Sequence, residues 1–277
     1  MIIDVDGFLI PYVDEELCSQ CGLCDDVCPI HTRADDISLH HGVYAAWAND
    51  EKVRYESSSG GVISVLSRAW VSSGQPVLGA IFSSNYQLVL HSAIRDIDGL
   101  SKLAGSKYIQ SNLFPGLLEL KALDADHVLI VGTPCQIQGV RNLVDRGIMR
   151  ETVLLVDMFC HGVPSYLLWR AYLGYLAKRI GVLTSFSFRN KHSGWHDFSI
   201  SARGTRGNYL RSHKKDIYMR FYLGNYCLRR PCYVCPFSAI SAADIRVGDF
   251  WGERYKHDER GVSLVVPLTA TGKEVFL

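Results

Sequence analysis

The chain has 277 residues, of which 48% are hydrophobic and 21% charged, the ordinary composition of a folded soluble protein of about two domains. Lys and Arg together number 29 against 28 Asp and Glu, so the net charge of +1 gives no reason to expect nucleic acid or an anionic membrane as a partner. The amino terminus carries acids where a signal peptide needs basic residues, and no apolar run approaches the roughly 20 residues of a spanning helix. We therefore expect a cytoplasmic protein without a membrane span.

The first predicted feature is a cysteine loop near the amino terminus with the spacing C-x2-C-x2-C-x3-C-P. This spacing is typical of iron–sulfur ligands in bacterial ferredoxins, and Gly22 supplies a position that is free to take positive φ. Zinc is the alternative, but zinc modules normally use two C-x2-C pairs that lie far apart in the sequence. The predicted cluster ligands are Cys18, Cys21, Cys24 and Cys28.

The segment that follows, residues 30–55, has no clear periodicity, and it lacks the second cysteine run of a complete two-cluster ferredoxin. A helical stripe then begins at Val62 and ends at Gly74. The serines and glycines before it, Ser57 to Gly61, leave backbone N–H groups open at the positive end of the helix dipole, where they can hold phosphate. An ordinary helix cap explains the same serines, and these residues alone favour the cap.

Residues 77–82 and 88–93 are predicted strands, and a short helix over 97–103 leads into the loop Gly105–Ser111. In this loop Lys107 can pair with a phosphate or an anionic flavin edge, and Tyr108 can stack on a planar ring. A solvated lysine beside a core tyrosine is an equally good interpretation.

Two βα units come next, with predicted strands over 127–131 and 152–158. The first strand leads to Thr133–Gln136, and the second leads to Cys160 and His161. Because ligands of open α/β sheets bind beyond the carboxyl ends of the strands, we expect these two segments to face one crevice.

From Phe186 to Arg211 the pattern changes to alternating strands with glycine turns. This segment and its sequel are rich in basic residues, which predicts either a binding surface for an anionic cofactor or substrate or a solvated hairpin face. Strands are expected again at 244–249 and 262–266, and a helix at Thr271. The chain ends inside that helix, which leaves open that this copy is truncated. The basic residues are Arg189, Lys191, Arg203, Arg206, Arg211, Lys214 and Lys215.

The nine cysteines fall mainly into two dense groups, which is ligand spacing and suits a reducing compartment. Two [4Fe–4S] clusters need eight thiolates, so one cysteine is to spare. The second group supplies three closely spaced thiolates, and we expect Cys160 to complete it, with Cys135 as the alternative to Cys160. The predicted second set of ligands is Cys160, Cys227, Cys232 and Cys235.

Several motifs occur in an order that resembles the coenzyme F420 hydrogenase/dehydrogenase beta-subunit family, from about Cys18 to the last residue. The motifs are Ser58–Gly61, Gly105–Tyr108, Gly132–Gln136, Phe159–Gly162 and Cys232–Pro236 through Gly248–Trp251. The resemblance implies an α/β (α+β mixed) fold, namely a flavin-binding core with a mixed sheet preceded by a partial ferredoxin-like cluster-binding segment. It also implies an oxidoreductase that moves electrons between 4Fe-4S clusters, FAD and a hydride-accepting or hydride-donating substrate, either a deazaflavin coenzyme or another molecule.

FAD is then expected across the start of the helix at Ser58 and the loop at Ser106, because a pyrophosphate needs N–H donors and the ring needs an aromatic neighbour and a cation. Lys107 and Tyr108 are the predicted catalytic residues. The predicted cofactor-binding residues are Ser58, Ser59, Gly60, Gly61, Ser106, Lys107, Tyr108, Thr133 and Gln136.

The expected division is a ferredoxin-like segment over residues 1–50 and a flavin and cluster domain over 51–277. The expected partner is a redox protein or an anionic coenzyme or substrate. The competing hypothesis is a non-catalytic electron-transfer adaptor that has kept the clusters and lost the flavin, associated with a larger redox or polysaccharide-biosynthesis system. A zinc-stabilised binding module is a third hypothesis.

Overall fold

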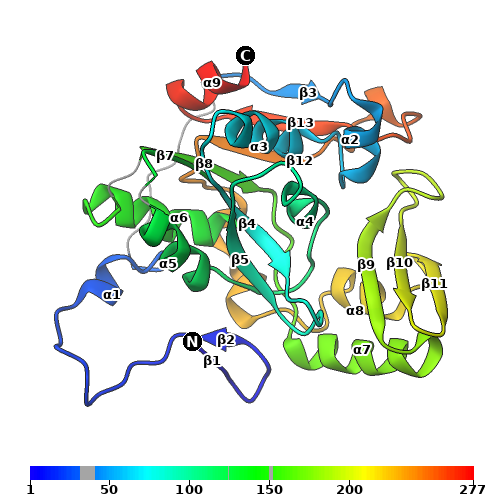
Figure 1. Cartoon of the computed structure of the whole chain (residues 1–277), viewed down its shortest axis with the longest axis horizontal. Coiled ribbons are helices and arrows are strands. Elements are labelled where there is room, and N and C mark those ends of the chain that lie inside the picture. Colours follow the sequence, from blue (N-terminus) through cyan, green and yellow to red (C-terminus); the bar gives the residue numbers. More distant parts are fainter. Residues whose placement is uncertain (32–40, 124, 150–151) are drawn as a thin grey trace.

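The computed structural model of the chain describes residues 1–31, 41–123, 125–149 and 152–277 (Figure 1). Its centre is an eight-stranded sheet in which parallel and antiparallel neighbours are mixed. In spatial order the strands are β3 (Tyr44–Ala46), β13 (Ser263–Pro267), β12 (Ile245–Asp249), β8 (Thr152–Met158), β7 (His127–Gly132), β4 (Val77–Phe82), β5 (Val89–Ile94) and β6 (Ser111–Asn112). The four strands at the centre, β12, β8, β7 and β4, run parallel, which confirms the predicted mixed α/β class.

The central strands are buried on both faces, as their nearly continuous apolar sequences predict. Successive side chains of a strand point to opposite faces, so Val128 and Ile130 pack into one core while Leu129 packs into the other. Helices cover both faces of the sheet (Figure 1). The first face carries α5 (Phe114–Leu123) and α6 (Pro134–Asp145), and the second carries α3 (Val62–Ser72) and α4 (Leu100–Leu103).

A second, three-stranded antiparallel sheet stands beside the large one and has the order β11-β10-β9. It packs on a helix through an aromatic core that includes Trp169, Phe188 and Tyr218, all almost fully buried. Aromatic rings bury large areas, so this core fixes the small sheet against the large one. The small sheet consists of β9 (Leu183–Asn190), β10 (Ser199–Gly204) and β11 (Gly207–Ser212), and the helices of this part are α7 (Tyr166–Ile180) and α8 (Ile217–Leu223).

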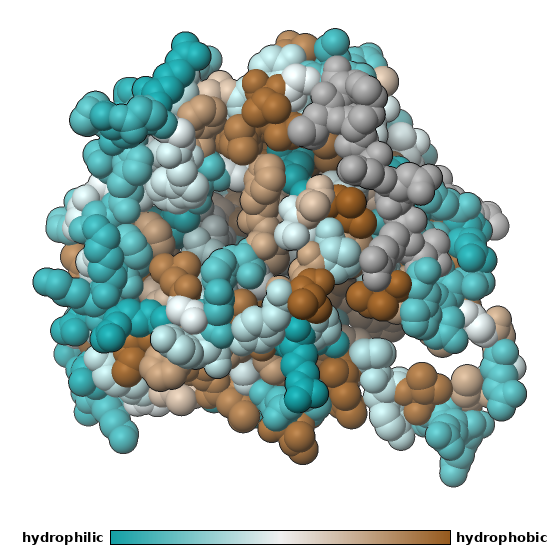
Figure 2. Space-filling model, turned by 180° about the vertical axis from the view of Figure 1, so that it is seen from behind, coloured by the Kyte–Doolittle hydropathy of each residue, from teal (hydrophilic) through white to brown (hydrophobic). Residues whose placement is uncertain are grey.

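The amino-terminal segment is a long loop that stands out from the body (Figures 1 and 2). It joins the body where the backbone N–H of Leu9 donates to Oε1 of Gln110, and again where its short helix lies beside α6. The remaining elements are β1 (Ile2–Ile3), β2 (Leu9–Ile10), α1 (Leu23–Asp26), α2 (Glu51–Glu56), α9 (Ala270–Phe276) and three short 3-10 helices, η1 (Arg230–Val234), η2 (Pro236–Ser238) and η3 (Glu253–Tyr255).

The predicted division at residue 50 remains a prediction. Residues 32–40 of the ferredoxin-like segment lie outside the described residues, and β3, at 44–46, pairs with β13 of the large sheet. Within the described ranges, no helix combines the length and the hydropathy that crossing a bilayer requires.

Candidate functional site

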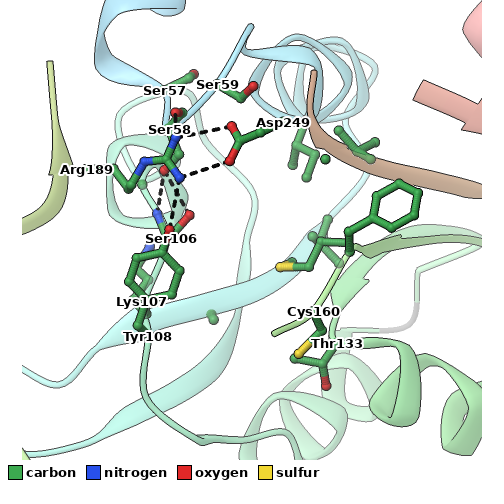
Figure 3. A pocket seen from close by; sticks show the side chains of 18 of the residues that line it. Ser57, Ser58, Ser59, Ser106, Lys107, Tyr108, Thr133, Cys160, Arg189 and Asp249 are labelled. Atoms are coloured by element: carbon green, nitrogen blue, oxygen red, sulfur yellow. Dashed lines mark hydrogen bonds and ion pairs between the residues drawn. The ribbon is translucent and has the colours of Figure 1, made fainter. Parts of the chain in front are cut away.

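A cavity of about 570 Å³ lies at the carboxyl ends of the central strands. Thr133 and Gln136, which follow β7, line it together with Cys160 and His161, which follow β8. This confirms that the two strand ends face one crevice, because neighbouring parallel strands end at the same edge of a sheet. In the close view, serines and Arg189 stand on one side of the cavity and Thr133 and Cys160 on the other (Figure 3).

The serine-rich turn before α3 forms one wall. Gly61 begins the helix with a φ of 91°, and no side chain caps it. The serines bond elsewhere: Oγ of Ser58 accepts from the backbone N–H of Ser106 at 2.7 Å, and the hydroxyl of Ser59 donates to the carbonyl of Val262 at 2.8 Å. The helix-cap interpretation of these serines is therefore wrong, and the amino end of α3 opens towards the cavity.

Gly60, unlike Ser58, Ser59 and Gly61, does not line the cavity. A Cβ on Gly60 would lie 2.4 Å from the carbonyl oxygen of Ala46 and 2.6 Å from the backbone nitrogen of Ser263, so only glycine fits. Its own N–H donates to Oγ of Ser263. Gly60 thus seats the turn against β3 and β13, while Ser58, Ser59 and Gly61 face the cavity.

The loop with Lys107 forms the adjoining wall. The Lys107 amino group donates to the carbonyls of Lys102, Leu103 and Ala104, all within 3.0 Å, and so closes the carboxyl end of α4. Burial lowers the pKa of Lys107 to about 7. The residue lines the cavity and holds the loop that carries Ser106 and Tyr108.

Tyr108 is held from several sides. Its ring stacks on Tyr222 with centroids 5.0 Å apart, and its carbonyl accepts from the Tyr218 hydroxyl at 2.6 Å. Its hydroxyl oxygen accepts from Nη1 of Arg189 at 3.0 Å. The structure therefore places Tyr108 at the cavity as a fixed ring rather than as a free stacking partner.

Arg189 of β9 ties the walls together (Figure 3). Its guanidinium forms a two-pronged ion pair with Asp249, and it also donates to the carbonyl of Ser58 at 3.0 Å. Burial alone would lower the pKa of Arg189, but Tyr108 and Asp249 outweigh it and raise the pKa above its usual value. Arg189 is thus a permanent cation between the small sheet and the serine turn.

Two features of the cavity were missed in the sequence. The first is an aromatic wall: Trp251 stacks on buried Trp195 with ring centroids 4.6 Å apart and an interplanar angle of 9°, and Trp251 as a whole is 54% exposed. Residues of the small-sheet segment continue this wall, with His213 stacked on Phe198 at 4.2 Å. The Gly248–Trp251 motif was the available signal, but nothing in it showed which face of the tryptophan is open.

The second missed feature is His91 of β5, which lines the cavity floor and is 1% exposed. Its Nε2 donates to the carbonyl of Val131 at 3.1 Å, which fixes the tautomer. Desolvation lowers its pKa to about 4, so the imidazole is neutral at physiological pH. In the sequence it is one polar residue in a strand, which gives no hint of a cavity.

Thr133 and Gln136 act locally on α6. Thr133 begins the helix in a capping box in which its backbone N–H donates to Oε1 of Gln136 at 3.1 Å. Nε2 of Gln136 donates to the carbonyl of Ser111 at 3.1 Å, and the Thr133 hydroxyl lies 3.3 Å from Sγ of Cys135. The pair fixes the first turn of α6 at the cavity edge.

Four cysteines from three segments gather beside this turn. We call them the core cysteine group: Cys135, Cys160, Cys232 and Cys235. The third segment is fastened beside the second by backbone bonds from Ser165 to Cys227 and from Arg229 to Val163, and η2 packs on α6. Gly162 is the contact point, since its Cβ position lies 3.2 Å from Cβ of Cys232.

In the core cysteine group, the negative charges of the thiolates affect the pKa values of other thiols of the group. Cys135 and Cys160 are exposed to solvent, yet the protein packed around them still desolvates their thiols. This desolvation raises the pKa values of Cys135, Cys160 and Cys232, that of Cys160 to about 12, and repulsion from the other thiolates of the group adds to the increase. Every pair of the four is coupled in this way. Among the described residues, no three Cys, His, Asp or Glu converge closely enough to hold a single metal ion.

Burial raises the pKa of the Cys227 thiol. The charge of Cys227 affects Tyr222, which the charges of Cys160 and Cys232 affect as well. The structure thus brings together Cys160, Cys232 and Cys235 of the predicted second set with Cys135, the alternative to Cys160. The place of Cys227 in that set remains a prediction.

The amino-terminal cysteines line their own loop. Gly22 has a φ of 75°, which confirms the expected left-handed position. Cys18, Cys21 and Cys24 are exposed, whereas Cys28 is half-buried. The backbone N–H of Leu23 and the hydroxyl of Ser19 lower the pKa of Cys21 by donating to its sulfur.

The predicted basic segment divides into two parts. Arg189 and Lys191 are buried, and the Lys191 amino group donates to three backbone carbonyls, of Arg54, Ser59 and Arg260. The other five are exposed, and among them Lys214 pairs with Asp197 at 3.1 Å. The exposed positive charge is therefore smaller than the sequence implied.

An α/β sheet with a strand-end cavity, and with cysteines grouped both beside it and in a ferredoxin-type loop, defines the class of iron–sulfur electron-transfer proteins. Residues 11–32 match the model of the 4Fe-4S binding domain, and residues 125–277 match the model that describes the C terminus of the beta subunit of coenzyme F420 hydrogenase/dehydrogenase. The chain therefore belongs to the coenzyme F420 hydrogenase/dehydrogenase beta-subunit family.

A coenzyme F420-dependent sulfite reductase of Methanocaldococcus jannaschii is 26% identical over 132 residues. That match covers 47% of this chain but only 21% of the relative, so the chain spans about a fifth of it. A chain of the F420-reducing [NiFe] hydrogenase complex from Methanosarcina barkeri, solved as a xenon derivative, superimposes with a TM-score of 0.59 at 19% identity. The superposition covers 84% of this chain and 77% of that chain, and shows a common fold.

Proposed function

We propose that the chain is a flavin-dependent oxidoreductase that passes electrons between two [4Fe–4S] clusters, FAD bound in the cavity, and a planar anionic hydride acceptor or donor such as a deazaflavin coenzyme. The observation that carries the proposal is that one cavity has an uncapped helix start on one side and Cys160 of the core cysteine group on the other. When bound there, FAD would interconvert two-electron and one-electron chemistry.

The residues present fit a dinucleotide. The amino end of α3 offers backbone N–H groups and a positive dipole end to a pyrophosphate, next to the hydroxyls of Ser58 and Ser106. Arg189 places a buried cation at the same wall, and His91 offers a neutral imidazole at the floor. Trp251 presents an open aromatic face on which a planar ring can stack.

The core cysteine group fits a [4Fe–4S] cluster, since it supplies four thiols from a strand end, a helix start and a cysteine-rich turn. We propose Cys135, Cys160, Cys232 and Cys235 as its ligands and Cys227 as the spare cysteine. The amino-terminal loop supplies the other four ligands, Cys18, Cys21, Cys24 and Cys28, in agreement with the match to a 4Fe-4S binding domain.

Named relatives support the choice of substrate class. The sulfite reductase and the hydrogenase complex described above both carry coenzyme F420 in their names. A deazaflavin of this kind combines a planar ring with negative charge, and the aromatic wall and Arg189 suit both properties.

The flavin content of anaerobically purified and reconstituted protein tests the proposal. We expect flavin absorbance with about one flavin per chain, because the cavity offers a single set of phosphate and ring contacts. An iron-loaded protein that binds no added FAD would contradict the enzyme hypothesis and leave the electron-transfer adaptor.

Lys107 provides a sharper test of the flavin loop. Lys107→Ala removes three hydrogen bonds that hold the end of α4, so we expect lower flavin occupancy and slower hydride transfer. Lys102→Ala is the matched control, because Lys102 is an exposed lysine of the same helix. If both variants keep the wild-type flavin occupancy and hydride-transfer rate, the loop is wrongly assigned.

A further inference from the structure

Helix α6 carries four residues on one face that are spaced by three or four positions: Cys135, Gly139, Asn142 and Arg146, the last being its C-cap. Residues with this spacing lie above one another on a helix. The first belongs to the core cysteine group, and the other three contact the amino-terminal cysteine loop. One helix face therefore touches both groups of thiols.

The contacts with the amino-terminal loop are specific. Nδ2 of Asn142 donates to the carbonyl of Val27 at 3.2 Å, and Nη1 of Arg146 pairs with Asp26 at 2.7 Å. Gly139 has no side chain, and the nearest neighbours of its Cβ position are the Val27 carbonyl oxygen at 3.8 Å and Cδ of Pro29 at 3.9 Å. The loop backbone thus lies directly on the helix.

These contacts place Cys28 close to the core cysteine group. Cys28 stands between Val27 and Pro29, which both meet Gly139, and Gly139 is four residues after Cys135. Four residues rise about 6 Å along a helix, so roughly one turn of α6 separates the contact from Cys135. The outer cysteines of the loop are exposed and Cys28 is half-buried, which leaves the outer side to an electron donor and turns the inner side towards α6.

We propose that this face of α6 is the electron route from the amino-terminal cysteine loop to the core cysteine group, and that Gly139 sets the separation of the two. The proposal rests on the proposed function, because both groups must hold clusters. With a cluster in each group, a low-potential one-electron donor would reduce the outer cluster, and that cluster would pass one electron to the core cluster and return to its oxidised state. No bond forms or breaks, and the contribution of the chain is the short distance.

Two substitutions at Gly139 distinguish an effect of the distance between the two cysteine groups from an effect on folding. Gly139→Leu places a branched side chain where Val27 and Pro29 lie and must push the loop outward, whereas the single Cβ of Gly139→Ala fits at ordinary contact distance. Gly174→Leu is the matched control: Gly174 lies in α7, and nothing lies within 4 Å of its Cβ position.

The readouts are the iron content, the spin–spin broadening in the paramagnetic resonance spectrum of the dithionite-reduced protein, and the rate at which the core group is reduced. For Gly139→Leu we expect a wild-type iron content, loss of the broadening and a slower rate. Gly139→Ala and Gly174→Leu should match the wild type. Wild-type broadening and rate in iron-replete Gly139→Leu would overturn the proposal.

Arg146→Glu gives a second way to move the loop if Gly139→Leu does not fold. It replaces an exposed ion pair with two like charges, so it displaces Asp26 without touching the core. The expected result is the same loss of broadening, with faster alkylation of Cys28 in the iron-free protein. Unchanged broadening and alkylation in this variant would overturn the proposal, whereas a wild-type protein with only one cluster would instead contradict the proposed function.

Discussion

His91 is the residue whose chemistry depends most clearly on its position. The unfolded chain takes up a proton on histidine near pH 6.5, whereas burial lowers the pKa of His91 to about 4 in the folded protein. Between these values the unfolded state binds more protons, so the free energy of unfolding falls as the pH is lowered through this window. The loss amounts to on the order of 3 kcal/mol and is complete below the folded pKa.

His91→Gln should remove this contribution, because glutamine keeps an N–H donor for the Val131 carbonyl and does not titrate. Urea unfolding between about pH 7 and about pH 4 should show a smaller loss of stability in the variant than in the wild type. His127→Gln, at an exposed histidine at the start of β7, is the control. Equal pH dependence in His91→Gln and the wild type would mean that His91 does not titrate as described.

Residue types alone could not have identified His91, Arg189 or Trp251. A single histidine in a strand and a single arginine in a basic segment are common, and their importance arises from burial and from partners distant in sequence, such as Asp249. The cysteines were different, because a thiol spacing is visible without a fold. Even there the spacing left open whether Cys160 or Cys135 completes the second group, and the neighbouring strand ends bring these two residues together.

At the level of elements, the sequence predicted the helices and strands that have a clear hydrophobic periodicity. The predicted strands at 77–82, 127–131 and 152–158 agree with β4, β7 and β8, and the helix after Pro164 agrees with α7. Elements without a clear stripe were missed, among them β3, α2, α5 and α8. The helix α5 shows why this happened. Its own apolar residues are spread around the whole helix, so the sequence has no single apolar face by which to recognise it.

The exposed basic residues of the small sheet and of the loop after it lead to a prediction about salt dependence. These residues, Arg203, Arg206, Arg211, Lys214 and Lys215, still form a positive surface after Arg189 and Lys191 are removed from the count. Such a field steers anions, and steering weakens as the Debye length falls from about 10 Å at 0.1 M salt to about 3 Å at 1 M. The second-order rate with an anionic hydride acceptor should therefore fall with salt.

Arg203→Glu combined with Arg206→Glu should flatten this salt dependence and leave the iron and flavin contents unchanged. A small neutral quinone provides the control, since its rate should vary little with salt or with the substitutions. A salt-independent rate for the anionic acceptor in the wild type would show that the surface is only a solvated face.

At the scale of the whole molecule, three parts of the chain meet around α6. Its first turn borders the cavity, Cys135 joins the core cysteine group, and Gly139 lies under the amino-terminal loop. The order of motifs in the sequence indicated which parts are present and which family they resemble. The arrangement around one helix depends on long-range packing, which a sequence pattern does not record.

The most direct test is the iron content of the anaerobically reconstituted chain and of two cysteine variants. We predict roughly eight irons for the wild type and for Cys227→Ser, and roughly four for Cys135→Ser, because two [4Fe–4S] clusters use eight thiolates and Cys227 is not among them. Roughly four irons in the wild type would contradict the two-cluster account. Loss of irons in Cys227→Ser but not in Cys135→Ser would contradict the ligand set that the core cysteine group defines.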